Sequence, residues 1–199
     1  MKNAESLFSE LNNELRKHGQ SMTIICVGGY VLQHYGIKET NDIDGFFDST
    51  PKIDTIIRQV GEKFGVNNDG ECWLNNSVQN LNCSPPKDIC KPLHEFTNLK
   101  ILAPPPEYIA GMKLRAGRER DIEDVTLIVK KLNLDNIDKF KKELAKYDFG
   151  SIDDSLIIEA FGRAYGMEWI ENYYIDQEEY FLDSIAANSS DFYDDNNIA

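Results

Sequence analysis

Two acidic residues, Asp42 and Asp44, occupy alternate positions at the start of the apolar stretch NDIDGFFD. The apolar residues predict a strand, and residues two apart in a strand point to the same side. Two neighbouring carboxylates repel each other unless a cation or a proton lies between them. Carboxylate oxygens suit magnesium, whose coordination shell is commonly completed by substrate phosphates. The spacing therefore predicts that Asp42 and Asp44 are ligands of Mg²⁺ or Mn²⁺.

A pair of glycines, Gly28 and Gly29, ends the preceding apolar run SMTIICV. Without side chains, these residues let backbone N–H groups approach a phosphate at the start of the following helix, where the helix dipole favours an anion. A magnesium ion beside this turn would stabilise the charge that develops in phosphoryl or nucleotidyl transfer. We therefore expect the glycines and the acids to form one nucleotide site. A tight turn at the glycines and solvated acids at a strand entry are the simpler alternatives.

The periodicity of the apolar residues predicts the elements that must position this site. We expect an amphipathic N-terminal helix, a buried strand that ends at the glycines, a short helix closed by Gly36, and a strand at the paired acids. A helix near Pro51, strands between residues 71 and 103, and helices from Pro106 to about residue 187 follow. This order predicts an α/β (α+β) fold, with a mixed sheet flanked by helices and followed by a helical C-terminal part.

The helix expected after Pro106 carries a second set of polar residues. If the helix is continuous, Lys113, Arg120 and Asp124 share one polar stripe with Gly117. Asp121 then falls on the apolar stripe and needs a buried partner. Alternatively, the helix breaks at Gly117, and Asp121 caps a second helix.

Three arginines in the same segment form a dense basic cluster: Arg115, Arg118 and Arg120. They either hold a triphosphate or an RNA end, or pair with the acids Glu119, Glu123 and Asp124 beside them. We therefore treat Arg118 as a candidate nucleotide-binding residue.

Aromatic residues predict two further features. Trp73 is expected to anchor the core, or to stack on a nucleobase. Five aromatic residues recur at intervals of about four and predict the packing face of a helix, or a docking surface for a partner. These five are Phe161, Tyr165, Trp169, Tyr173 and Tyr174.

The negative charge is concentrated near the C-terminus. The formal net charge is −13, from 34 acids and 21 bases, and residues 168–199 contain nine of the acids with no lysine or arginine. The remaining 25 acids and 21 bases disfavour broad nucleic-acid binding but leave room for a local basic patch. We expect three segments: a core at residues 1–132, a helical region at 133–187 and an acidic, disordered tail at 188–199.

The apolar segments and the cysteines indicate the cellular compartment and the redox state of the thiols. We expect a cytoplasmic protein without a membrane partner, because we find neither a signal peptide nor an apolar run of membrane-spanning length. The four cysteines lack a regular framework, which favours reduced thiols. Cys83, Cys90 and His94 do not have the spacing of a typical zinc site.

The glycine pair, the Asp-x-Asp strand and the later block KLRAGRERDIEDV are together similar to the nucleotidyltransferase superfamily with a polymerase-β-like fold. The later blocks resemble bacterial nucleotidyltransferase-like proteins related to AbiEii-type toxins. This resemblance implies metal ligands at Asp42 and Asp44 and phosphate binding at Gly28 and Gly29. It also implies that Lys113 and Asp121 contact the nucleotide or balance its charge.

The resemblance further implies an NTP substrate, an RNA (such as tRNA) or protein acceptor, and an antitoxin protein as a partner of a toxin–antitoxin or abortive-infection system. The sequence departs from the family pattern in two respects. Gly29 stands where many transferases have serine, and the third carboxylate has only Asp88 and Glu95 as candidates. A catalytically inactive nucleotide- or protein-binding module on the same fold is therefore the alternative.

Overall fold

A five-stranded mixed sheet forms the centre of the computed structural model, which describes residues 4–40, 42–67, 71–78 and 84–179. The strand order is β3-β2-β1-β5-β4. β1 (Met22–Val27) pairs antiparallel with β2 (Ile43–Phe46) and parallel with β5 (Leu99–Ala103). β3 (Leu74–Asn75) runs parallel to β2, and β4 (Lys91–Glu95) runs antiparallel to β5. The predicted mixed α/β fold is confirmed, whereas the predicted tail at residues 188–199 lies outside the described residues.

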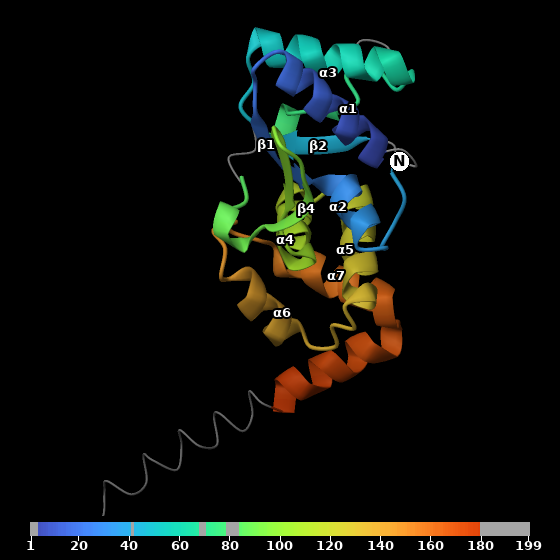
Figure 1. Cartoon of the computed structure of the whole chain (residues 1–199). Helices are drawn as coiled ribbons and strands as arrows, with labels where there is room; N and C mark the ends of the chain where they lie inside the picture. Colours follow the sequence, from blue (N-terminus) through green and yellow to red (C-terminus); the bar gives the residue numbers. More distant parts are fainter. Residues whose placement is uncertain (1–3, 41, 68–70, 79–83, 180–199) are drawn as a thin grey trace, which may run out of the picture.

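Two long helices, α1 (Ala4–Lys17) and α3 (Pro51–Phe64), pack against each other on one side of the sheet (Figure 1). The Thr50 side chain accepts a hydrogen bond from the Ile53 N–H group, and a proline at the first helical position suits the start of α3. Gly65 ends α3 in a left-handed conformation. The apolar face predicted for the N-terminal helix is buried and consists of Leu7, Phe8, Leu11 and Leu15.

Phe8 lies at the centre of the core beneath the sheet. Its ring centroid is 5.7 Å from the rings of Tyr30, Trp73 and His94, which belong to three different parts of the chain. Trp73 is 3% exposed, and its indole N–H group donates to the Ile57 carbonyl oxygen at 3.0 Å. The prediction that Trp73 anchors the core is therefore confirmed.

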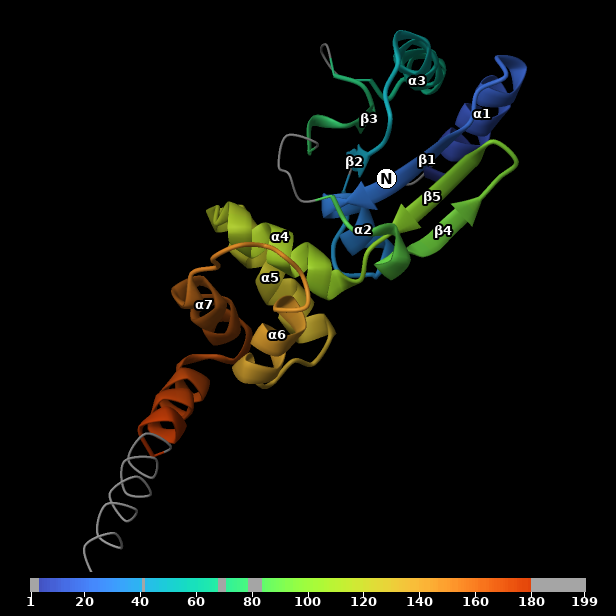
Figure 2. The ribbon, with the colours of Figure 1, turned by 90° about the vertical axis from the view of Figure 1, so that its left-hand side faces the viewer.

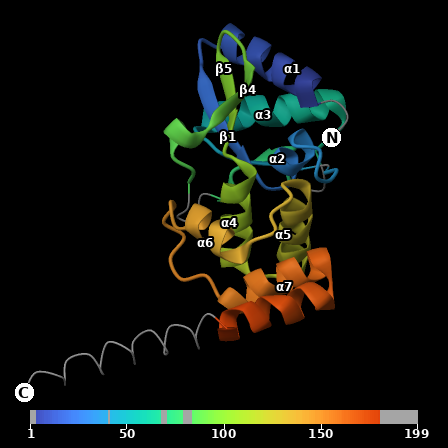
Figure 3. The same ribbon diagram turned by 90° about the horizontal axis from the view of Figure 1, so that it is seen from below.

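The other helices of the helical part lie beyond the end of the sheet that is away from α1 and α3 (Figures 2 and 3). α2 (Gly28–His34), by contrast, follows β1 directly, and its Tyr30 ring packs on Phe8 of α1. α4 (Pro106–Ala116) and α5 (Glu119–Lys131) follow β5, and α5 packs against both α4 and α7. α6 (Ile137–Leu144), α7 (Asp154–Tyr165) and a helix over residues 167–179 complete the helical part.

The helical C-terminal part differs from its prediction in two places. Residues 145–153 form a loop, because the Asp153 side chain caps α7 through the Ser155 N–H group and thereby fixes where that helix begins. A second break lies at Gly166, which has a φ of 94°. The aromatic face therefore bends at Gly166, and Trp169 packs back on Phe161 with 5.3 Å between the ring centroids.

The central position of Phe8 generates a stability prediction. We expect Phe8→Ala to lower the free energy of unfolding by about 3–5 kcal/mol, because the surrounding rings cannot close the cavity that is left. Urea unfolding followed by circular dichroism measures the change. The matched control is Leu127→Ala, whose side chain is 39% exposed and which should cost about 0.5 kcal/mol. Equal losses in the two variants would contradict the central role of Phe8.

Candidate active site

Gly28 and Asp44 meet where β1 ends and β2 begins. Val27, the last residue of β1, pairs with Asp44, and α2 starts at the next residue. Gly28 has a φ of 64°, which residues with side chains rarely adopt, and a Cβ atom there would lie 3.0 Å from Asp44 Oδ2. The missing side chain therefore allows the carboxylate to rest against the first turn of α2.

Gly29 serves a different purpose, because its missing side chain accommodates Thr40. A Cβ atom at Gly29 would lie 2.7 Å from Thr40 Oγ1 and 2.9 Å from Thr40 Cβ. Thr40 Oγ1 in turn accepts a hydrogen bond from the Asp42 N–H group at 3.3 Å. A serine at position 29 would collide with Thr40, which gives a physical reason for this departure from the family pattern.

Asn75 holds one oxygen of the Asp44 carboxylate. The two residues pair in the register of β2 and β3, and Asn75 Nδ2 donates to Asp44 Oδ1 at 3.0 Å. Asn75 Oδ1 accepts hydrogen bonds from the Ser77 N–H group at 2.9 Å and from the Ser77 hydroxyl at 2.7 Å. These two donors fix the orientation of the amide, so that its nitrogen faces Asp44. No donor within the described ranges bonds to Asp44 Oδ2, the oxygen that faces Gly28.

The surroundings of Asp44 raise its pKa above the ordinary value of an aspartate. Burial contributes most to this increase, and the nearby charge of Asp42 adds to it. The hydrogen bond from Asn75 and the positive charges of Lys113 and Arg120 act in the opposite direction. A bound cation would relieve the remaining cost of keeping Asp44 ionised in this position.

Asp42 lies outside β2, although the sequence predicted that both acids belong to one strand. The strand begins at Ile43, and the Asp42 side chain is exposed. Its charge nevertheless acts on Asp44, so the two carboxylates are electrostatic neighbours. Two carboxylates, one with an oxygen that lacks a donor, suit a hard cation that retains waters or substrate phosphates as its other ligands. Mg²⁺ or Mn²⁺ therefore fits these donors.

The two candidates for a third carboxylate do not join Asp42 and Asp44. Glu95 ends β4 at the far edge of the sheet, and Asp88 is exposed on the short 3₁₀ helix η2 (Lys87–Ile89). Among the described residues, no group of three or more histidine, cysteine, aspartate or glutamate side chains is arranged to hold a metal. The zinc site considered at Cys83 involves a residue outside those ranges.

The residue beside Asp44 on the neighbouring strand is thus Asn75, which sequence reasoning did not select. Its strand is only two residues long, and such a segment carries no readable period of apolar residues. The available signal was the short run WLNN at residues 73–76, which belongs to the resemblance to bacterial nucleotidyltransferase-like proteins.

Lys113 lies between two buried carboxylates. Its Nζ atom is 2.8 Å from Asp121 Oδ1 and 2.7 Å from Asp124 Oδ2. Lys38, in the connection that leads to Asp42, contacts Asp124 Oδ1 at 2.5 Å. Asp121 and Asp124 are 4% and 2% exposed, so their charges depend on these lysines.

The paired carboxylates keep Lys113 protonated. Burial alone would lower the pKa of Lys113, but the hydrogen bonds and charges of Asp121 and Asp124 outweigh it and leave the pKa above its ordinary value. Asp121 Oδ2 is buried without a hydrogen-bond partner in the described part of the chain. The predicted partner of Asp121 is therefore present, and one carboxylate oxygen remains unsatisfied.

The break at Gly117 corrects two details of the sequence interpretation. Gly117 has a φ of 62° and ends α4, so a continuous polar stripe from Lys113 to Asp124 does not exist. Asp121 is not the cap of the next helix, because Arg118 holds that position and Asp121 is the third residue of α5. Lys113 and Asp124 still meet, because the turn at Gly117 packs α5 against α4.

The arginine cluster is free of the acids that could have neutralised it. Glu119 pairs with Arg163, and Asp124 pairs with two lysines. Within the described ranges, none of Arg115, Arg118 and Arg120 forms an ion pair. All three arginines are exposed; the charge of Arg120 acts on Asp44, and Arg118 precedes the first residue of α5. The predicted role of Arg118 in nucleotide binding stays a prediction.

Comparison with known families agrees with this geometry. The family model described as "Nucleotidyltransferase of unknown function (DUF6036)" matches residues 2–177. The chain belongs to this family. No curated protein and no solved structure matches the chain. None of the helices in the described ranges has both the length and the apolar character that a membrane span requires.

The contact between Gly28 and Asp44 can be tested by comparing Gly28→Ala with Gly65→Ala. Gly28 and Gly65 both have a φ of 64°, but an added Cβ atom at Gly65 meets nothing within 4 Å. Alanine at either position should cost about 1–2 kcal/mol of stability through backbone strain. Only Gly28→Ala should displace the Asp44 carboxylate, and we expect it to weaken the binding of Mg²⁺–NTP about tenfold or more in calorimetry. Equal affinity in the two variants would show that this contact does not shape the site.

The buried charges around Lys113 generate a second prediction. We expect Lys113→Met to lower the free energy of unfolding by about 3–5 kcal/mol, because two buried carboxylates lose their common partner. Adding Asp121→Asn should restore part of the loss. Lys146→Met is the control, because Lys146 is 58% exposed and its pair with Glu143 contributes little to stability. Chemical denaturation compares the variants, and a small loss in Lys113→Met would contradict the network.

Proposed function

We propose that this protein transfers a nucleotidyl group from a magnesium–NTP complex to a hydroxyl group of an RNA or protein acceptor. The observation that carries this proposal is the Asp44 carboxylate, which is held against Gly28 and lies within reach of the charges of Lys113 and Arg120. Membership of a nucleotidyltransferase family supports the class of reaction. We place this activity in the cytoplasm, in keeping with Cys26, Cys72 and Cys90, which are free thiols.

The proposed roles follow from charge and position. Asp42 and Asp44 would hold the magnesium ion, which when bound neutralises phosphate charge and stabilises the charge of the transition state. Because Gly28 has no side chain, its backbone can lie directly beside the Asp44 carboxylate. Arg120 supplies positive charge for the triphosphate, and Lys113, whose charge also acts on Asp44, is kept in position by Asp121. In the reaction, the acceptor oxygen bonds to the α-phosphorus, the bond to pyrophosphate breaks, and the hydroxyl proton passes to water.

A specific observation also favours a second candidate function. Asn75 provides a neutral amide where a neighbouring strand would bring a further carboxylate to Asp44. A protein with only two acids at this position could bind a nucleotide without transferring it. An inactive nucleotide- or protein-binding module is therefore the alternative, and the two functions differ in whether labelled nucleotide is incorporated.

The resemblance to AbiEii-type proteins motivates a further part of the proposal. We place this activity in the toxin of a toxin–antitoxin or abortive-infection system, with an antitoxin protein as partner. The exposed apolar residues near the end of the described chain would suit a protein partner. They are Met167, Tyr174 and Ile175.

The paired acids test the proposed activity directly. We expect Asp42→Asn and Asp44→Asn each to abolish incorporation of labelled NTP into total RNA or protein and to remove magnesium-dependent NTP binding, because a carboxylate ligand is lost. Circular dichroism should show that both variants remain folded. Asp88→Asn, an exposed acid on η2, serves as the control and should keep full activity.

Calorimetry with the wild-type protein separates the outcomes of this test. Binding of Mg²⁺–NTP without incorporation would favour the inactive module. Full activity in either Asp42→Asn or Asp44→Asn would contradict the assignment of the metal ligands.

A further inference from the structure

A cavity of about 1050 Å³ lies on the same face of the sheet as Asp44. Ile25 pairs with Phe46 and Thr23 pairs with Lys100, so these four residues point to one side of three adjacent strands. All four line the cavity. Asp44 precedes Phe46 by two residues and therefore shares this face. The cavity begins one side-chain position, or about 7 Å along β2, beyond the carboxylate.

The cavity and the glycine turn lie in opposite directions from Asp44. β2 runs antiparallel to β1, so that Asp44 faces Val27 at the end of β1 while Phe46 faces Ile25 nearer its middle. The cavity continues from Ile25 toward Ser21, at the beginning of β1. Gly28 and α2, by contrast, follow the end of that strand. Asp44 thus separates the glycine turn from the cavity.

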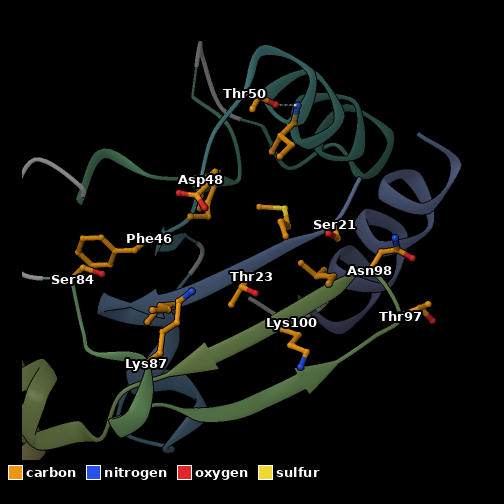
Figure 4. Close-up of a pocket in the computed structure, with 15 residues that line it drawn as sticks. Ser21, Thr23, Phe46, Asp48, Thr50, Ser84, Lys87, Thr97, Asn98 and Lys100 are labelled. Atoms are coloured by element: carbon orange, nitrogen blue, oxygen red, sulfur yellow. Dashed lines mark hydrogen bonds between the residues drawn. The ribbon is translucent and has the colours of Figure 1, made fainter. Parts of the chain in front are cut away.

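The lining of the cavity carries a small excess of positive charge, although the chain as a whole is acidic. It includes two lysines, Lys87 and Lys100, against one acid, Asp48, although the whole chain carries a net charge of −13. Figure 4 shows both lysines on one side of the cavity, across β1 from Asp48. Hydroxyl groups that can donate hydrogen bonds also line the cavity, and these belong to Ser21, Thr23, Thr50, Ser84 and Thr97.

The two ammonium groups remain available to a ligand. Lys100 Nζ lies 3.8 Å from Glu95, but both side chains are 61% exposed, so this ion pair contributes little and is easily exchanged. Lys87 forms no ion pair among the described residues. Lysine ammonium groups and hydroxyl donors are the side-chain groups that commonly contact the phosphate and sugar oxygens of nucleic acids.

The geometry of transfer adds a directional argument. The attacking and leaving oxygens lie roughly in line on either side of the phosphorus. If the pyrophosphate leaves toward Lys113 and Arg120, whose charges act on Asp44, the acceptor oxygen must approach from the other side. The cavity at Thr23 and Phe46 lies on the side of Asp44 away from the glycine turn and is therefore the candidate for this approach.

We propose that this cavity, the acceptor cavity, binds the end of a single-stranded RNA, with Lys87 and Lys100 at its phosphates. This inference rests on the proposed nucleotidyl transfer and names its acceptor class. The terminal hydroxyl oxygen bonds to the α-phosphorus, pyrophosphate leaves toward Lys113, and the hydroxyl proton passes to water. A serine- or threonine-containing peptide would gain little from two lysines, so RNA fits the lining better.

The test measures RNA binding separately from catalysis. A labelled single-stranded RNA of about ten nucleotides is titrated with full-length protein in fluorescence anisotropy at low salt. We expect Lys87→Ala/Lys100→Ala to raise the Kd about tenfold or more and to reduce its dependence on salt, because two phosphate contacts are lost. Lys139→Ala/Lys142→Ala removes the same charge from exposed positions on α6 and should leave the Kd nearly unchanged. Thr23→Leu, which replaces a hydroxyl inside the cavity, should weaken RNA without changing the net charge.

Each outcome decides between the acceptor cavity and its alternatives. Failure of the wild-type protein to bind RNA, or equal losses in the two double variants, would overturn the proposal. Labelling of a serine- and threonine-rich peptide that RNA does not inhibit would assign the cavity to a protein acceptor and would also overturn it. Calorimetry with Mg²⁺–NTP distinguishes a failure of the proposed function. If the wild-type protein does not bind Mg²⁺–NTP, nucleotidyl transfer is refuted. If the wild type binds Mg²⁺–NTP but Lys87→Ala/Lys100→Ala leaves the RNA affinity unchanged, only the acceptor cavity is refuted.

Discussion

The close approach of the Asp44 carboxylate to Gly28 is the constraint on which the candidate site depends. It requires a residue without a side chain at the end of β1, in a conformation with a φ of 64°. It also requires a fixed register between β1 and β2, because a slip by one residue would turn Asp44 to the other face of the sheet. Gly45 contributes to this register, since a Cβ atom there would lie 2.7 Å from the Ile24 side chain. A glycine at the start of α2 and a glycine in β2 thus determine where one carboxylate lies.

The buried charges on α4 and α5 extend this constraint to the helical part. Lys113 joins Asp121 and Asp124, and Lys38 ties Asp124 to the connection that leads into Asp42 and β2. Buried ion pairs of this kind add little net stability, because desolvation of the charges offsets their attraction. Their effect here is positional: they fix α5, and with it Arg120, relative to the strand that carries Asp44. The unsatisfied Asp121 oxygen shows that the network tolerates an energetic cost for this arrangement.

The sequence predicted the parts of the site that depend on local pattern. The glycine pair, the acids and the Lys113 segment were all visible, because each combines a residue type with a short spacing. Contacts between distant segments were not visible. The placement of Thr40 in the space beside Gly29, and the effect of the Arg120 charge on Asp44, depend on how loops and helices pack. The break at Gly117 could be anticipated as an alternative, because glycine is the usual residue for a left-handed helix end.

Asn75 shows how one neutral side chain shapes the chemistry available at this site. The pKa of Asp44 is already raised by burial and by the charge of Asp42. A third carboxylate in direct contact would raise it further, and Asp44 would then be harder to keep ionised. The amide instead donates a hydrogen bond that favours the ionised form and leaves the other oxygen facing Gly28. Two acids and an amide suit one divalent cation better than two. Under the proposed function, a site built in this way would bind the nucleotide with little charge repulsion. Among the described residues it offers no third acid to accept the proton of the acceptor hydroxyl, so that proton would leave through water.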